Sequence, residues 1–289
     1  MENFLQYLFT GLAQGGIYAL VALGFVLIYN VTGIINFAQG EFVMLGALLA
    51  VTFHNSGLSL PVVILLTVLT VAAIGGLLEF VTIRPARGAG VMTLIIITIG
   101  LSMAVRGVAL LIWGTESLVI PPYSGTKTIS IAGATLMPQD LWVFGTTGVV
   151  VAALYVFLEK TVMGKAFRAC VINRLGASLM GISPKRMSTL AFGLGAGIGA
   201  LGGVAFAPTL AIYDMGLGLG IKGFTAAALG GLTSAPGAVV AGFVLGVLES
   251  FGTAYVSSGY KDGISLAILL VMLLLRPQGL FGIYGSKRV

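Results

Sequence analysis

Polar and ionisable side chains are rare in the apolar parts of this sequence, and the few that occur there are the first candidates for chemistry. They are Asn36, Gln39, Glu41, Lys222 and Glu249. An ionisable group at membrane depth costs on the order of 3 kcal/mol or more, so it is usually shielded inside a helix bundle and marks the path of a solute. Glu41 has a second interpretation, in which a helix begins near Asn36 and the carboxylate lies at the membrane interface. The sequence leaves both interpretations open.

The residue types that catalysis or metal binding would require are scarce. The chain has one histidine, His54, which we expect in a loop, and one cysteine, Cys170, which we expect to pack as a small residue. There is no His-Glu-x-x-His motif, no Ser/His/Asp grouping and no Gly-x-x-x-x-Gly-Lys-Ser/Thr loop for nucleotide phosphates. Gly197, Gly199 and Gly202 fit Gly-x-Gly-x-x-Gly, but inside an apolar run this spacing indicates close helix packing. We therefore predict no catalytic residue, no metal site and no cofactor bound by this chain.

The amino-acid composition indicates the environment that surrounds these polar residues. Of the 289 residues, 58% are hydrophobic and only 8% are charged, far below the roughly 25% charged residues of a soluble domain. Apolar runs of about 20 residues, each long enough to cross a bilayer, follow one another along the chain. We predict an all-α fold, a polytopic membrane helix bundle of about eight spans that forms a single domain over 1–289.

Two of the apolar segments are expected to be interrupted or re-entrant. The first is Gly33–Gly46, and the second is Ile221–Ser250, with predicted breaks at Gly230, Gly231 and Pro236 that give a short half-helix followed by a span ending near Glu249. Paired interrupted segments in the two halves of a transporter point to the path of its substrate. Whether 220–233 crosses the bilayer or re-enters is left open, and with it the side of the amino terminus.

One long hydrophilic stretch, Glu159–Arg186, stands out and is called the island below. It holds six of the fifteen basic residues, Lys160, Lys165, Arg168, Arg174, Lys185 and Arg186. An excess of Lys and Arg marks cytoplasmic loops, so we place the island and the basic carboxyl-terminal tail on that side and the segment Trp113–Asp140 outside. Membrane topology explains the basic residues without a nucleic-acid partner. Glu79, Arg84 and Arg87 are expected to anchor a span at a water interface, and Arg106 to snorkel.

Small residues recur every four positions in the island, at Ala169, Asn173, Ala177 and Gly181. On one continuous helix they would share a face, and a face of small side chains can fit closely against another protein. Together with Arg168 they are the predicted coupling helix, in a coupling loop over 159–187. The alternative is a solvated basic loop without a docking role.

Four segments in order along the chain carry a resemblance to a known family. They are Asn36-Phe37-Ala38-Gln39-Gly40-Glu41 with the earlier Tyr18-Ala19-Leu20, the loop from Arg168-Ala169 to Gly181-Ile182, Phe224–Gly231, and Arg276-Pro277-Gln278-Gly279-Leu280-Phe281-Gly282. Together they resemble the permease of branched-chain amino acid ABC transporters over nearly the whole chain. Gln39 stands where many relatives have His, and Gly223 where they have Ala. Arg168-Ala169-Cys170 replaces the Glu-Ala-Ala loop of other ABC importers.

The resemblance implies a function and a set of partners. The chain would be a non-enzymatic permease subunit that imports leucine, isoleucine and valine across a bacterial inner membrane. It would work with a second homologous permease in a heterodimer, two cytoplasmic ATPases that use ATP, a periplasmic or lipid-anchored binding protein, and membrane lipid. Asn36, Gln39, Glu41, Lys222 and Glu249 would then line the substrate path, and the island would dock the ATPases.

Other functions remain open on the sequence alone. Interrupted helices would equally serve a self-sufficient secondary transporter or channel for small solutes. Related ABC permeases carry urea, amides or other amino acids. An intramembrane enzyme is the least supported alternative, because the residues it would need are missing.

Overall fold

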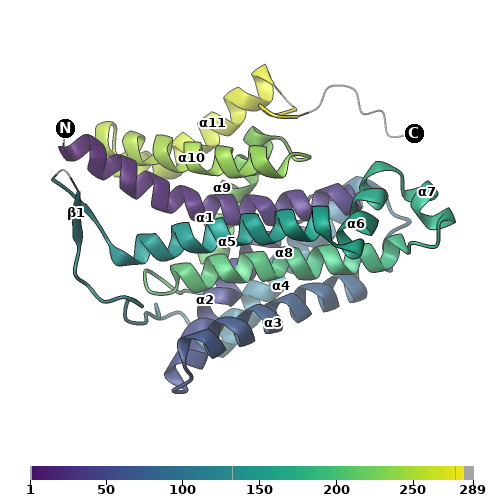
Figure 1. The fold of residues 1–289 in the computed structure, drawn as a ribbon, viewed down its shortest axis with the longest axis horizontal. Coiled ribbons are helices and arrows are strands. Elements are labelled where there is room, and N and C mark those ends of the chain that lie inside the picture. The colour runs from purple at the N-terminus through teal and green to yellow at the C-terminus, as the bar shows by residue number, and fades with distance from the viewer. Residues whose placement is uncertain (1, 132, 277, 283–289) are drawn as a thin grey trace.

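The computed structural model describes residues 2–131, 133–276 and 278–282, and helices dominate it (Figure 1). The helices are α1 (Glu2–Thr32), α2 (Gln39–Asn55), α3 (Leu60–Leu78), α4 (Val91–Trp113), α5 (Pro138–Lys160), α6 (Val162–Ile172), α7 (Arg174–Leu179), α8 (Pro184–Phe206), α9 (Met215–Gly230), α10 (Ala235–Tyr255) and α11 (Lys261–Leu275). A π-helical turn, η1 (Glu79–Ile83), extends α3, and a short 3₁₀ turn, η2 (Ser258–Tyr260), precedes α11. The strands β1 (Ile129–Ile131) and β2 (Ala134–Leu136) pair antiparallel, with Ile129 opposite Leu136.

The predicted membrane helix bundle is confirmed. Among the described residues, seven helices are long and apolar enough to cross a membrane. Two further helices, α2 and α9, have 17 and 16 residues and lie among the long ones. The short helices follow breaks in the chain at 33–38 and 207–214, so the expectation of interrupted segments is also confirmed.

The two ends of α1 mark the two ends of the bundle (Figure 1). Near its start, Gln6 Nε2 donates a hydrogen bond of 3.0 Å to the carbonyl oxygen of Thr135 beside the hairpin. Near its finish, Asn30 Nδ2 donates one of 3.4 Å to the carbonyl of Thr233 in the turn between α9 and α10. The island, with α6 and α7, lies at this second end. The start of α1 and the island are therefore at opposite ends of the bundle.

The carboxyl-terminal motif of the resemblance packs at the island end. The backbone N–H groups of Leu280 and Phe281 donate to the carbonyls of Leu229 and Gly230, at 2.8 and 3.2 Å. Gly279 has φ of +81°, and a Cβ there would lie 2.4 Å from the Gly231 nitrogen. The motif thus satisfies carbonyls at the carboxyl end of α9, and only glycine fits at its closest point. The basic residues Lys287 and Arg288 lie outside the described residues.

The predicted break at Gly230, Gly231 and Pro236 is confirmed, and it separates the short helix α9 from the span α10, which has Pro236 in its first turn. α9 runs unbroken from Met215 to Gly230, and Gly231 with φ of +99° begins the turn that leads into α10. The positive φ of Gly231 is one that glycine adopts without a steric penalty. A further interruption lies upstream, at 207–214, and its effect is to start α9 inside the bundle.

Glycine contacts set the helix spacing, as the sequence predicted. A Cβ on Gly15 of α1 would lie 2.7 Å from the Phe243 Cα atom of α10, and one on Gly203 of α8 would lie 2.1 Å from the Val43 carbonyl oxygen of α2. Gly203 adjoins the Gly-x-Gly-x-x-Gly stretch, whose Gly199 packs against Phe42. These are packing surfaces between backbones.

Candidate functional site

The first turns of α2 and α9 meet inside the bundle, and we call their contact the α2–α9 junction. A Cβ on Gly40 would lie 2.0 Å from the Gly216 carbonyl oxygen, so the two backbones touch. The first four N–H groups of a helix lack intrahelical partners, and the helix dipole adds a partial positive charge there. Two such ends at one place favour negatively charged groups.

Glu41 supplies a carboxylate at this junction and is only 1% exposed. Its Oε1 accepts hydrogen bonds from Ser102 Oγ at 2.7 Å and from Arg106 Nη2 at 2.6 Å, both on α4. Its Oε2 lies against Gly216 and has no hydrogen-bond partner among the described residues. The carboxylate is thus inside the bundle, and Arg106 is its counter-ion, which corrects the prediction that Arg106 snorkels.

Asn36 and Gln39 bring further polar atoms to the same segment. Asn36 Oδ1 accepts from the Ala38 N–H at 3.2 Å, and Gln39 Nε2 donates to the Gly195 carbonyl of α8 at 2.9 Å. Within the described chain, Asn36 Nδ2 and Gln39 Oε1 have no partner, although both atoms are buried. Buried polar groups are nearly always hydrogen-bonded, so three unpaired atoms in one six-residue segment, counting Glu41 Oε2, indicate where a polar solute could bind.

Lys222 and Glu249 form a second group, the Glu249 cluster, which comprises Tyr18, Lys222, Glu249, Lys261, Asp262 and Ser265. Glu249 is fully buried, and its Oε1 accepts from Lys222 Nζ at 2.9 Å and from the Tyr18 hydroxyl at 3.1 Å. Its Oε2 accepts from Ser265 Oγ at 2.9 Å. Asp262 Oδ1 and Lys261 Nζ complete the cluster, at 2.9 Å from Lys222 Nζ and 3.3 Å from Glu249 Oε1 respectively.

The five residues predicted for a substrate path therefore fall into two groups. No hydrogen bond or ion pair among the described residues joins the α2–α9 junction to the Glu249 cluster. The junction keeps unpaired buried atoms, whereas both Glu249 oxygens are bonded. Sequence reasoning missed Tyr18, Ser102, Asp262 and Ser265, because hydroxyls and an exposed aspartate give no signal until the fold brings them to a buried charge.

Glu79 is a third buried carboxylate, and its predicted role as an anchor at a water interface is wrong. It is fully buried, pairs with Arg87, and accepts hydrogen bonds from Ser188 at 2.8 Å and Thr189 at 2.6 Å. Ser188 and Thr189 belong to α8, while Glu79 is the first residue of η1, directly after α3. The carboxylate therefore ties α3 to α8 at the island end.

The island does not form the single small-residue face that the spacing predicted. The helix breaks at Asn173, whose φ is −150° and whose side chain accepts from the Gly176 N–H at 2.8 Å to begin α7. Ala177 is buried against the core that contains Phe167 and Cys170, and Gly181 ends the segment with φ of +81°. Ala169, Asn173, Ala177 and Gly181 consequently do not lie in one row.

Large apolar side chains occupy the outer surface of the island instead. Ile172 and Leu179 are 82% and 81% exposed, and Leu175 and Met180 are also exposed. Leu175 and Leu179 are four residues apart on α7 and share its outer face. Arg168 pairs with Glu159 at 2.5 Å. The buried Cys170 thiol has its pKa raised by desolvation, opposed by the Arg174 guanidinium, so it is unsuited to act as a nucleophile.

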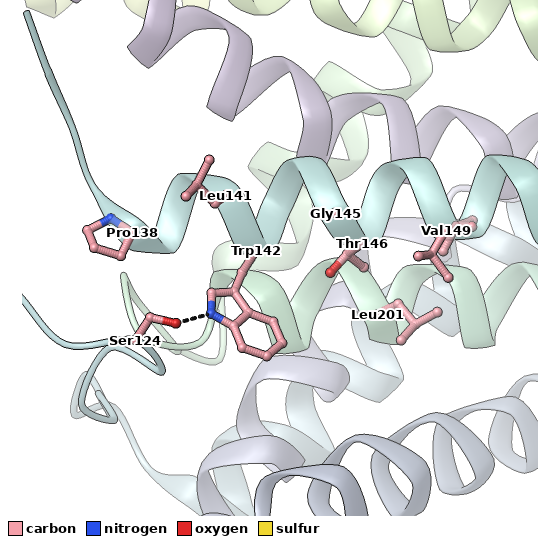
Figure 2. Close-up of a pocket in the computed structure, with 9 residues that line it drawn as sticks. Ser124, Pro138, Leu141, Trp142, Gly145, Thr146, Val149 and Leu201 are labelled. Carbon is pink, nitrogen blue, oxygen red and sulfur yellow. Dashed lines mark hydrogen bonds between the residues drawn. The ribbon is translucent and has the colours of Figure 1, made fainter. Parts of the chain in front are cut away.

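An apolar cavity of about 470 Å³ lies at the other end, between α5 and α8 (Figure 2). Trp142 forms one wall, and its Nε1 donates to Ser124 Oγ at 2.8 Å. No ionisable side chain lines it among the described residues, and Leu141 and Val149 are exposed beside it. Because an amino acid needs partners for its ammonium and carboxylate, this cavity suits apolar contacts with lipid or a neighbouring helix.

Comparison with known proteins gives one consistent result. Residues 7–273 match the family described as branched-chain amino acid transport system / permease component. The chain is 34% identical to the high-affinity branched-chain amino acid transport system permease protein LivH of Salmonella typhimurium, covering 96% of both chains. It is 33% identical to the permease protein BraD of Pseudomonas aeruginosa, over 97% of this chain and 96% of that one. Among solved structures, PsaBC from Streptococcus pneumoniae in complex with Fab matches with a TM-score of 0.52 and 13% identity, over 95% of this chain and 92% of that one.

Proposed function

Because this chain belongs to the family of permease components of branched-chain amino acid transport systems, we propose that it is the membrane-spanning subunit of an ATP-driven importer of leucine, isoleucine and valine. The observation that carries the proposal is similarity to high-affinity permeases along 96% of both chains. A match of that extent includes the spans, the junction and the island together. The bacterial inner membrane is the proposed location, with the island in the cytoplasm, as its excess of basic residues favours.

The proposed energy source is a pair of cytoplasmic ATPases, because the sequence has no phosphate-binding loop of its own. They would dock on the island through Ile172, Leu175 and Leu179. Exposed apolar side chains at a helix surface in water are costly unless a partner covers them. The remaining proposed partners are a second homologous permease, forming a heterodimer, and an external periplasmic or lipid-anchored binding protein.

The packing of the island on α1 and α8 would transmit its movement to the α2–α9 junction. Phe167 and Ala177 pack in one core cluster with Leu20 and Leu27 of α1 and Ala191 of α8. α1 leads directly into the break at 33–38, and the Gly195 carbonyl of α8 holds Gln39. A tilt of the island would therefore shift both helices that position the junction. Asn36, Gln39 and Glu41 would bind the polar groups of the substrate, and the path they line would open alternately to the two sides of the membrane.

The first experiment reconstitutes this permease with its co-purified subunits and measures leucine uptake. Uptake should require ATP, and Glu41→Gln should lower it at least tenfold, because the amide keeps the Ser102 contact but loses the charge that pairs with Arg106. Uptake by the isolated chain driven by a sodium or proton gradient would reject the proposal in favour of a secondary transporter.

The second experiment tests the docking surface by introducing a negative charge into it. Leu179→Glu should abolish ATPase co-purification while leaving expression normal, because the side chain is exposed and the change removes no buried contact. Val119→Glu is the matched control, since Val119 is also an exposed apolar residue, in the segment between α4 and β1. Normal ATPase association in Leu179→Glu would show that the island is a solvated loop. Ala177→Trp does not serve here, because a ring at that buried position would disrupt the core.

A further inference from the structure

A second cavity lies at the island end of the bundle, where the island meets the spans. It has a volume of about 560 Å³ and is lined by residues of η1, α6, the turn at 181–183 and α8. Its walls are mainly apolar, with Phe80, Met163 and Leu190 among them. The cavity therefore bridges the membrane-embedded and island parts of the chain.

Two cations line this cavity, Arg84 and Arg186. The Arg84 guanidinium carbon lies 4.8 Å from the centre of the Phe80 ring. Within the described chain, no ion pair with a carboxylate is formed by either arginine. Glu79 does not line the cavity, and its carboxylate is bonded to Arg87, Ser188 and Thr189. The cavity thus carries two positive charges that no carboxylate of the described residues pairs with.

The cavity also adjoins a surface suited to hydrocarbon. Leu77, Phe80 and Val81 are exposed on the α3 segment, within a helix apolar enough to span a membrane. A ligand that fits must combine an anionic group for the arginines with an apolar part that continues along α3. Basic pockets between spans on the cytoplasmic side bind anionic lipid head groups in this way.

We propose that this cavity is a binding site for one anionic phospholipid, with its phosphate between Arg84 and Arg186 and an acyl chain along Leu77 and Val81. The same lipid contacts Met163 of the island, so it joins the coupling loop to α3 and α8. A membrane rich in anionic lipid therefore stabilises the position of the island. This binding does not depend on which solute the permease carries.

The test uses the full permease, purified in mild detergent with the subunits that accompany it. Bound phosphatidylglycerol is counted by native mass spectrometry, and lipid affinity is measured by titration. A Lys or Arg near a lipid surface contributes about 1 kcal/mol, which corresponds to about fivefold in affinity. Arg84→Gln and Arg186→Gln should each weaken binding by about fivefold, and the double variant by about 25-fold. The double lysine variant keeps both charges and should retain most of the binding.

Two controls separate this site from general attraction to a basic surface. Lys160→Gln removes an exposed cation of the island that does not line the cavity and should leave binding unchanged. Inorganic phosphate should not displace the lipid, because it has no apolar part. Equal lipid binding in the double glutamine variant, or an equal loss in Lys160→Gln, would overturn the proposal. Unchanged lipid binding with loss of ATPase association would instead assign the two arginines to protein docking.

The parent protein provides an independent measurement that requires no variant. In lipid nanodiscs, its thermal stability should be higher with phosphatidylglycerol than with phosphatidylcholine alone, because a ligand that binds only the folded state stabilises it. Equal melting temperatures in the two lipids would contradict the proposed site even where a variant failed to fold.

Discussion

Replacing Lys222 by methionine isolates the balance of charge in the Glu249 cluster. Methionine keeps a long, unbranched side chain but removes the ammonium that lies 2.9 Å from Glu249 Oε1 and 2.9 Å from Asp262 Oδ1. Glu249 is fully buried, so its charge cannot be compensated by water. Lys261, at 3.3 Å from the same oxygen, becomes the nearest cation.

The expected cost follows from this arrangement. Removing one partner of a buried ion pair typically costs 3 to 5 kcal/mol, because the other charge stays buried and unpaired. Since Lys261 remains, we expect the lower end, about 3 kcal/mol. The double variant Lys222→Met/Glu249→Gln removes both charges and keeps one oxygen to accept from either the Tyr18 or the Ser265 hydroxyl. Because the amide nitrogen can donate to the hydroxyl that the oxygen does not serve, the double variant should recover to within about 1 kcal/mol of the parent, and the non-additivity is the sign of direct coupling.

Thermal unfolding in detergent and leucine uptake in vesicles distinguish a structural role of Lys222 and Glu249 from direct contact with the substrate. At about 2 to 4 °C per kcal/mol for a chain of 150 to 250 residues, Lys222→Met should melt about 6 to 12 °C lower, while the double variant should melt near the parent and keep its uptake. A stable double variant without uptake would place Lys222 and Glu249 on the substrate path. Additive losses in the two single variants would refute the reasoning from the ion pair.

Two further predictions concern the island end. Cys170 is the sole cysteine, and since its thiol is buried with a raised pKa, maleimide at neutral pH should label it far more slowly than a cysteine introduced by Leu179→Cys; equal labelling rates would show that α6 does not pack as described. Gly279→Ala should destabilise the protein by more than about 1 kcal/mol, because the residue has positive φ and its new Cβ would meet Gly231, and a melting temperature equal to that of the parent would contradict this close contact.

The fold class could be predicted because the solvent leaves few alternatives. In hydrocarbon every backbone polar group needs an internal partner, so long apolar runs must become helices. The position of the island outside the spans could also be predicted, because its charged residues cannot lie within the long apolar runs. The small-residue row failed because a period of four assumes an unbroken helix. Asn173 is followed three residues later by Gly176, whose N–H it caps, and the preference of asparagine for helix starts was the available signal.

The pairing of the buried charges could not be predicted for a different reason. Glu41 and Arg106 are 65 residues apart, and Glu249 finds Tyr18 across 231 residues. Such contacts are set by which helices become neighbours, and hydropathy is the same for many arrangements of the same spans. The sequence indicated that Glu41 and Glu249 were unusual, but it gave no means of choosing their counter-ions.

The buried ion pairs and the glycine contacts have complementary roles in this bundle. Glycine surfaces, such as Gly15 against Phe243, bring backbones close, but a smooth surface does little to fix how far one helix slides along another. Glu79, directly after α3, bonds to α8, and Glu41 of α2 bonds to α4. Glu249 of α10 bonds to α1, α9 and α11, so each carboxylate joins specific positions on different helices. A polar pair out of register would leave a buried charge unpaired, at a cost of several kcal/mol. Close packing therefore permits the helices to tilt against each other, while the ion pairs limit the arrangements to the few in which every carboxylate keeps a cation.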